Sequence, residues 1–213
     1  MVLAISPAGV TLSGGLLPYA HFPARVNSHL KMCPTTPTVE TMGAALTAKL
    51  IAGTATPAEL WSFIRSVFDW GGKTGNRVRG NMQKNYNASF TMIQFAAAAS
   101  ALSAVSAASA PAALQTSLKS SISAINLVHG LSTSYGSKML RFLRPDISGV
   151  FDSVISGYTG FSCDERNFAS YAVDCLTVAS NLGAAGIVNP RNGTTTWRAG
   201  DVDQALFAFC QGW

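Results

Sequence analysis

The feature that most constrains the fold is a helix-start pattern at residues 56–59. Thr56 can cap a helix, Pro57 suits its first position, and Glu59 completes a capping box. Apolar residues follow at helical spacing, namely Leu60, Phe63, Ile64, Val67 and Phe68. Further helices are expected over residues 42–51, 89–109, 111–128, 138–143 and 164–182, and from residue 201 onward. Few segments alternate with period two, so we predict an all-α fold.

Two segments carry loop patterns instead. Pro and Gly punctuate residues 1–40, and we therefore expect no long helix there. Residues 73–87 are rich in Gly, Asn and basic side chains, and we expect a basic loop. Pro145 is expected to end the helix before it, and Asp152 to cap the next one.

The chain of 213 residues is the length of one domain, and 48% hydrophobic against 12% charged residues indicates a packed core. The formal net charge is +5, and residues 65–84 hold five basic side chains against one acidic one. This local excess suits a partner that carries phosphates, although a solvated basic surface is the plainer interpretation.

Several classes are disfavoured. The start lacks the positive region of a secretory peptide, and the Ala-rich stretch of residues 95–114 is only weakly apolar, so we expect a cytoplasmic protein with no membrane segment. The four cysteines and three histidines show no metal-ligand spacing, so we expect no metal site and reduced thiols.

The most informative segment is residues 129–154, which we expect to form a helix, a tight turn at residues 134–136 and a second helix from residues 137–138. Backbone N–H groups at the start of a helix favour a phosphate. The same dipole disfavours an ammonium at Lys138, and a neutral amine is what a Schiff-base nucleophile requires. Asp152 follows fourteen residues later, after a bend that can bring its carboxylate beside the amine.

These residues resemble the helix-hairpin-helix DNA glycosylase superfamily. The hairpin there commonly reads L-P-G-V-G-x-K, and residues 132–138 read S-T-S-Y-G-S-K, with Ser134 in place of the first Gly. A bacterial 8-oxoguanine DNA glycosylase-like branch reads roughly S-K-x-L-x-F-x-x-P-x-x-F-P-[IV]-x-D. The matching residues are Ser137, Lys138, Leu140, Phe142, Pro145, Val150 and Asp152.

The resemblance implies a single two-lobed helix-hairpin-helix domain over residues 1–213, with the active site in the cleft between the lobes. Lobe A would be about residues 55–145, including the hairpin at 130–138, and lobe B about 1–54 plus 146–213. It implies that Lys138 attacks the anomeric carbon and that Asp152 moves protons and stabilises the sugar cation. The main-chain amides that would hold a DNA phosphate are those of Ser134, Tyr135, Gly136 and Ser137. A hairpin-bound K⁺ or Na⁺ is the one cofactor to consider.

Other residues are candidates on chemistry alone. Lys73, Arg77, Arg79 and Arg141 are candidate DNA contacts, or simply solvated charges. The aromatic side chains of Trp70, Phe151 and Trp213 are candidates for a base pocket, although core packing is the commoner role for such residues.

The expected function is therefore a DNA glycosylase that flips a modified or oxidised base, similar to 8-oxoguanine, out of duplex DNA and excises it. A Lys nucleophile also permits an AP lyase step through a Schiff base. Three alternatives stay open: an antiviral defence glycosylase acting on a bulky modified base in phage DNA, a non-catalytic helix-hairpin-helix DNA-binding module, and a structural helical protein. We expect a monomer that binds double-stranded DNA.

Overall fold

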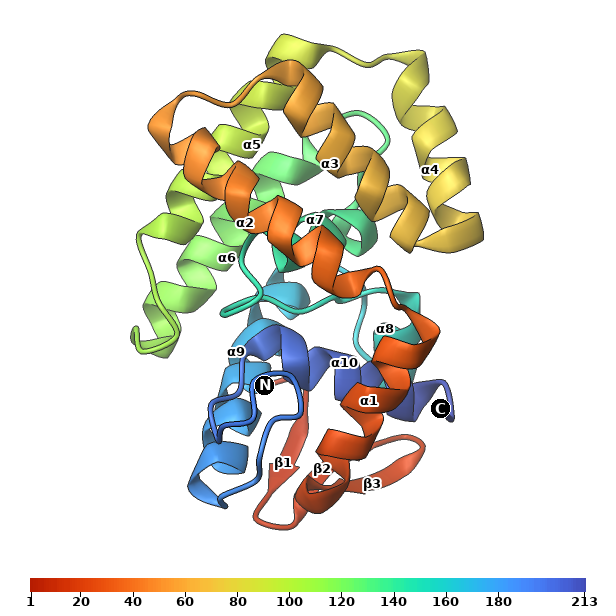
Figure 1. The fold of residues 1–213 in the computed structure, drawn as a ribbon, viewed down its shortest axis with the longest axis vertical. Coiled ribbons are helices and arrows are strands. Elements are labelled where there is room, and N and C mark those ends of the chain that lie inside the picture. The colour runs from red at the N-terminus through yellow and green to blue at the C-terminus, as the bar shows by residue number, and fades with distance from the viewer.

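The computed structural model describes residues 1–213 and is mostly helical (Figure 1). A three-stranded antiparallel sheet comes first, in the order β1 (Ala4–Ser6), β2 (Gly9–Leu12) and β3 (Gly15–Pro18). The helices are α1 (Phe22–Met32), α2 (Thr36–Ala52), α3 (Pro57–Trp70), α4 (Gly72–Lys84), α5 (Ala88–Ser103), α6 (Pro111–Asn126), α7 (Thr133–Leu143), α8 (Ser153–Thr159), α9 (Glu165–Ala184) and α10 (Ala199–Cys210). The predicted helical class is confirmed, while the small sheet was not predicted.

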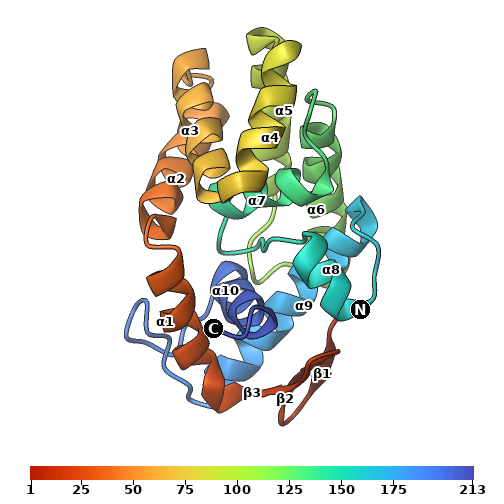
Figure 2. The ribbon, with the colours of Figure 1, turned by 90° about the vertical axis from the view of Figure 1, so that its right-hand side faces the viewer.

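The elements lie in two groups along the long axis (Figures 1 and 2). The upper group is α2 to α7, and the lower group is the sheet with α1, α8, α9 and α10. Helix α1 packs on α10, and α6 of the upper group packs on α9 of the lower group. The buried apolar side chains form one continuous cluster through both groups. None of the helices combines the length and apolarity needed to cross a membrane.

Helix α2 belongs to the upper group, because it packs on α3, α5 and α7. The expected lobe boundary at residue 54 would have put this helix with the other lobe. Gly43 explains the close approach, since a Cβ there would lie 2.0 Å from the Phe142 carbonyl oxygen in α7. The boundary between the two groups therefore falls between α1 and α2.

The expectation of no long helix before residue 40 was wrong. Helix α1 starts at Phe22 and α2 at Thr36, and each has a proline in its first turn, Pro23 and Pro37. Proline is tolerated there because the first N–H groups of a helix have no partner inside it. These prolines therefore start helices and do not interrupt them.

The expected basic loop at residues 73–87 was also wrong, because residues 72–84 form α4. Gly75 lies where α4 meets α3, since a Cβ there would lie 1.9 Å from the Phe68 carbonyl oxygen of α3. The glycine thus permits close packing of α4 on α3. The basic side chains of residues 73–84 are therefore carried by a helix and not by a loop.

Local helix-start patterns were predicted more accurately. The capping box of Thr56 and Glu59 is present, and α3 buries the five apolar residues expected. Pro111 opens α6, Asp152 caps α8, and α7 ends before Arg144. The last helix begins two residues earlier than predicted, at Ala199, and its capping box pairs Arg198 with Asp201.

Candidate active site

Helix α7 begins at Thr133, four to five residues earlier than predicted. Residues 134–137 therefore lie in its first turns and not in a turn before it. The Gly136 N–H donates to the Ser132 carbonyl (2.7 Å), so it is already engaged within the helix. The connection from α6 is residues 127–132, where Gly130 has φ 83°. By helix geometry, the N–H groups free for an anion are those of residues 133–135.

The structure brings Lys138 of α7 and Asp152 together. Lys138 Nζ lies 2.7 Å from Asp152 Oδ2, and the two side chains are only 7% and 10% exposed. The same amine lies 3.5 Å from the Ser134 carbonyl oxygen and 5.0 Å from the centre of the Tyr135 ring. A carboxylate at this distance can accept a proton from the amine and can stabilise a developing positive charge.

Asp152 is held in place by its second oxygen. Asp152 Oδ1 accepts hydrogen bonds from the N–H groups of Val154 (3.0 Å) and Ile155 (3.4 Å) at the start of α8. This cap fixes the carboxylate while the other oxygen faces Lys138. The carboxyl group is therefore preorganised, with one oxygen structural and one oriented toward the amine.

Ser137 links the two segments that carry this pair. Its Oγ accepts a hydrogen bond from the Phe151 N–H (3.1 Å) and donates to the Ser134 carbonyl (3.0 Å). The side chain is fully buried, so Ser137 sets the register of residue 152 against α7. The side chain thus has a positioning role, whereas the phosphate contact expected from the sequence concerned the main-chain amide, which lies beyond the first turn of α7.

A second carboxyl group, that of Asp203, lies near the pair. Asp203 of α10 accepts a hydrogen bond from the Tyr171 hydroxyl (2.9 Å), and Phe151 packs on the Tyr171 ring at 5.2 Å. Burial raises the pKa of Asp203 to about 7, against the opposing charge of Arg141. Phe151 has no exposed surface, so the expectation that it lines a base pocket is contradicted. No role was predicted for Asp203 from the sequence.

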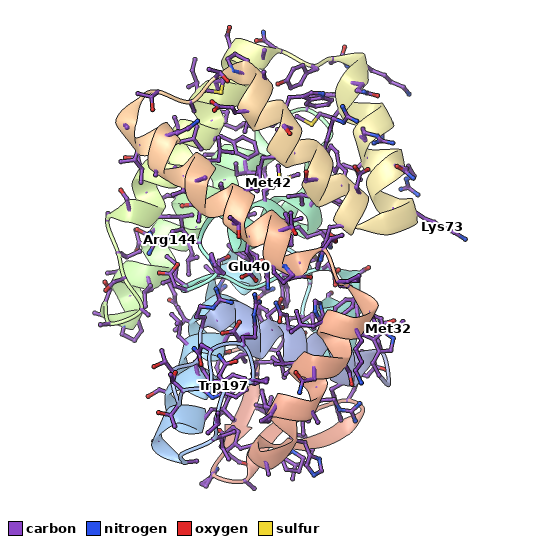
Figure 3. All side chains as sticks on the ribbon, viewed as in Figure 1. Met32, Glu40, Met42, Lys73, Arg144 and Trp197 are labelled. Atoms are coloured by element: carbon purple, nitrogen blue, oxygen red, sulfur yellow. The ribbon has the colours of Figure 1, made fainter.

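Arg141 does not reach the surface, which contradicts its expected role in DNA binding. Its side chain is 1% exposed and lies 2.7 Å from Glu40 of α2. Glu40 also pairs with Arg191 (2.7 Å) and Arg198 (3.1 Å), and it lies where the upper and lower groups meet (Figure 3). Burial alone would raise the Glu40 pKa, but the three guanidinium groups lower it to about 2.

The basic side chains of α4 are on the surface next to the hairpin. Lys73 and Arg77 are exposed, and Lys73 extends away from the ribbon (Figure 3). Arg79 is partly engaged, because it pairs with Asp69 at 3.1 Å. Helix α4 contacts the hairpin region at both ends, through Thr74 to Tyr135 (2.8 Å) and through Asn85 to His129 (3.2 Å). Its positive charge thus adjoins the N-terminus of α7.

The two candidate tryptophans both pack near His29 in α1. The ring centres are 6.3 Å apart for His29 and Trp70, and 6.2 Å apart for His29 and Trp213. Trp70 is fixed by a hydrogen bond from its Nε1 to Thr36 Oγ1 (2.9 Å). Both indoles are half-buried, so each offers part of its surface to a ligand.

The cysteines carry no metal or disulfide chemistry in the structure. All four are free, and no three His, Cys, Asp or Glu side chains are grouped to hold a metal ion. Cys163 is the one near the candidate site, where its Sγ contacts the Phe151 carbonyl at 2.9 Å. Burial and the Asp152 charge raise the Cys163 pKa to about 11, which favours the protonated thiol.

Comparisons with protein-family models, with curated proteins and with solved structures found no match to this chain.

Proposed function

We propose that this protein is a DNA glycosylase that removes a modified or oxidised base from duplex DNA, with Lys138 as nucleophile and Asp152 as its proton partner. The observation that carries the proposal is the buried contact of 2.7 Å between Lys138 Nζ and Asp152 Oδ2. A buried ion pair is seldom more stabilising than apolar side chains of the same size. A chemical role accounts for why an amine and a carboxylate occupy this position.

The reaction can be written with groups that lie at the site. Lys138 gives a proton to Asp152, and its neutral amine then attacks C1′ of the extruded nucleotide. The N–C1′ bond forms as the glycosidic bond breaks, and the base leaves with that electron pair and takes the proton that Asp152 received, so Asp152 is again a carboxylate. The attached Lys138 nitrogen then loses a proton to the ring oxygen, and its freed lone pair forms a C=N bond as the ring oxygen leaves C1′ with the electrons of the C–O bond. Asp152 stabilises the positive charge that develops on the sugar.

The surroundings of the pair support a DNA partner. The free N–H groups of residues 133–135 lie at the positive end of α7, and the basic helix α4 lies beside them. Together they offer an anchor for the sugar–phosphate backbone close to the amine. Trp70 and Trp213 are the remaining candidates for contacts to the flipped base.

Borohydride trapping tests the chemistry directly. The protein is mixed with duplexes that carry 8-oxoguanine, an abasic site or a phage-type modified cytosine, and borohydride then reduces any imine. A covalent complex is expected with the wild type, and Lys138→Ala is expected to form none. The duplex that traps best identifies the base and separates repair from phage defence.

Two other outcomes would change the proposal. Release of base without trapping would keep the glycosylase but make water the nucleophile, with Asp152 as its base. DNA binding without release or trapping on any duplex would replace the proposal with the non-catalytic module. An absence of salt-dependent DNA binding would leave only a structural role.

The contribution of α4 can be measured through the salt dependence of DNA affinity. Each phosphate contact changes the slope of log K against log salt by about 0.9, so Lys73→Ala/Arg77→Ala is expected to reduce it by about 2. Lys119→Ala is the matched control, since Lys119 is an exposed lysine on α6. Equal slopes for the double variant and the wild type, measured by fluorescence anisotropy, would remove α4 from the DNA interface.

A further inference from the structure

The ring of Tyr135 forms part of the surroundings of the Lys138 amine. The tyrosine is 5% exposed, and Lys138 Nζ lies 5.0 Å from the centre of its ring. The same nitrogen lies 2.7 Å from Asp152 Oδ2 and 3.5 Å from the Ser134 carbonyl oxygen. One ring and two oxygens therefore define where the nitrogen lies.

The Tyr135 hydroxyl is fixed to the start of α4. Thr74 Oγ1 donates a hydrogen bond to the Gly71 carbonyl oxygen (3.0 Å), so the Tyr135 hydroxyl is the donor in its own contact with Thr74 Oγ1 (2.8 Å). A Cβ on Gly71 would lie 2.6 Å from this hydroxyl, and the glycine therefore leaves the room that the tyrosine needs. Phe68 of α3 packs on the ring, with the two centres 5.7 Å apart. The ring is thus held by two helices other than its own.

Tyr135 does not compete with Asp152 for the proton of the amine. Burial raises the pKa of the Tyr135 hydroxyl, the hydrogen bond with Thr74 opposes this change, and the charge of Asp152 adds to it. A phenol with a pKa above its usual value of about 10 stays protonated at neutral pH. The side chain is therefore a neutral ring beside the amine and not a second base.

The Lys138 nitrogen carries a positive charge twice in the proposed reaction. It is an ammonium before its proton passes to Asp152, and it is cationic again once it has bonded to C1′. The face of an aromatic ring attracts a cation. The Tyr135 ring thus favours the same place for the nitrogen in both states, and a nucleophile held in one orientation reacts faster.

We propose that Tyr135 positions Lys138 for attack, with its ring facing the amine and its hydroxyl tying that ring to Thr74 of α4. This inference rests on the proposed glycosylase function, which supplies the reaction. The hairpin pattern L-P-G-V-G-x-K has valine at this place, and valine is too short to make either contact. Tyr135 acts through Lys138 and takes no part in bond breaking.

The rate of imine formation on a duplex with an abasic site tests the inference, because no base has to be released. Tyr135→Leu removes the ring and the hydroxyl, and it is expected to slow single-turnover trapping by about 10²-fold. Tyr135→Phe keeps the ring and loses one hydrogen bond, so it is expected to stay within about tenfold of the wild type. The affinity for DNA is expected to be unchanged in both variants, since the side chain is buried.

Tyr19→Leu is the matched control for loss of a buried tyrosine. Tyr19 is 8% exposed, packs on Phe22 at 5.9 Å and accepts a hydrogen bond from Asn181 Nδ2 (2.9 Å). None of the contacts between cations and rings in the structure involves it. Tyr19→Leu should therefore trap at the wild-type rate. Equal rates for Tyr19→Leu and Tyr135→Leu would overturn the positioning of Lys138 by Tyr135.

A double-mutant cycle with Thr74→Val tests the tie to α4. This change removes the same hydrogen bond as Tyr135→Phe, so the two single variants and the double variant are expected to trap at one common rate at saturating protein. Losses that multiply in the double variant would show that the two hydroxyl groups act independently, and the tie would be wrong.

A spectroscopic signature separates the failure of this inference from the failure of the proposed function. In protein labelled with ¹³C-lysine, the ε-methylene signal of Lys138 is identified by its loss in Lys138→Ala. Protons over the face of an aromatic ring resonate upfield, so this signal is expected upfield in the wild type and in Tyr135→Phe, and at its ordinary position in Tyr135→Leu.

The two kinds of failure then give different results. The upfield signal with no trapping of any duplex by the wild type would show that the ring places the amine while the glycosylase chemistry is wrong. Trapping that depends on Lys138, at the same rate in the wild type and in Tyr135→Leu, would retain the chemistry and overturn the role of Tyr135. An ordinary position of the signal in the wild type would overturn the contact itself.

Discussion

Replacement of Asp152 by Asn is expected to lower the rate of base release by about 10²–10⁴-fold, the usual range for loss of a positioned proton-transfer group. The amide keeps the size of the carboxyl group and can still accept the N–H groups of Val154 and Ile155 that cap α8. It cannot accept a proton from Lys138 or balance the charge on the sugar. Single-turnover base release from the best substrate duplex measures the effect.

Asp164→Asn is the matched control for this change. Asp164 caps α9 in the same way, through the Asn167 N–H at 2.8 Å, and no lysine lies against it. Asp152→Asn also leaves the buried Lys138 without its partner, so it should cost more stability than Asp164→Asn, and activity is compared where circular dichroism shows both variants folded. Only Asp152→Asn should lose activity. Equal activity of the two variants would reduce Asp152 to a helix cap and remove its role in proton transfer.

The parts of the fold that depend on neighbouring residues could be predicted from the sequence. The start of α3 at Thr56 and the cap of α8 at Asp152 are set by side chains within three residues of the backbone they bind. The approach of Asp152 to Lys138 is also semi-local, because only a short helix end and one bend separate them. Sequence spacing and the family resemblance were enough to place this pair together.

The parts that depend on distant packing could not be predicted. Gly75 is typical of a loop in the sequence, but in the structure it lies within α4 and lets the backbone of Phe68 pack against it. Arg141 carries a charge on a helix, and nothing near it in the sequence indicates that Glu40 of another helix will bury it. For the same reason, the sequence indicated only that His29 is not a metal ligand. The indoles near it come from the ends of two distant helices, and no local pattern predicts that contact.

The buried charges around Glu40 give the largest expected change in stability. Glu40 is the shared partner of Arg141, Arg191 and Arg198, which come from α7 and from the segment before α10. Glu40→Gln removes one charge with almost no change in volume and leaves Arg141 buried without its partner. Breaking a buried pair in this way costs about 3–5 kcal/mol. The free energy of unfolding, from urea titration followed by circular dichroism, should fall by that amount near neutral pH.

Glu59→Gln separates this effect from the general loss of an ion pair. Glu59 pairs with Lys49 at the surface, and Gln can retain the capping box with Thr56, so only a small change is expected. A loss for Glu40→Gln no larger than that for Glu59→Gln would show that the buried arginines do not need this carboxylate.

The dependence on pH gives a second check on the charge of Glu40. Its pKa is about 2 in the folded protein against the usual 4.5, so the folded state binds this proton less readily than the unfolded state. The stabilisation by Glu40 is therefore complete above about pH 4.5 and is lost as the pH falls toward 2. Gln does not titrate, so the difference in stability between wild type and Glu40→Gln should shrink over this interval. A difference that stayed constant from pH 7 to pH 2.5 would mean that the variant acts through packing and not through the missing charge.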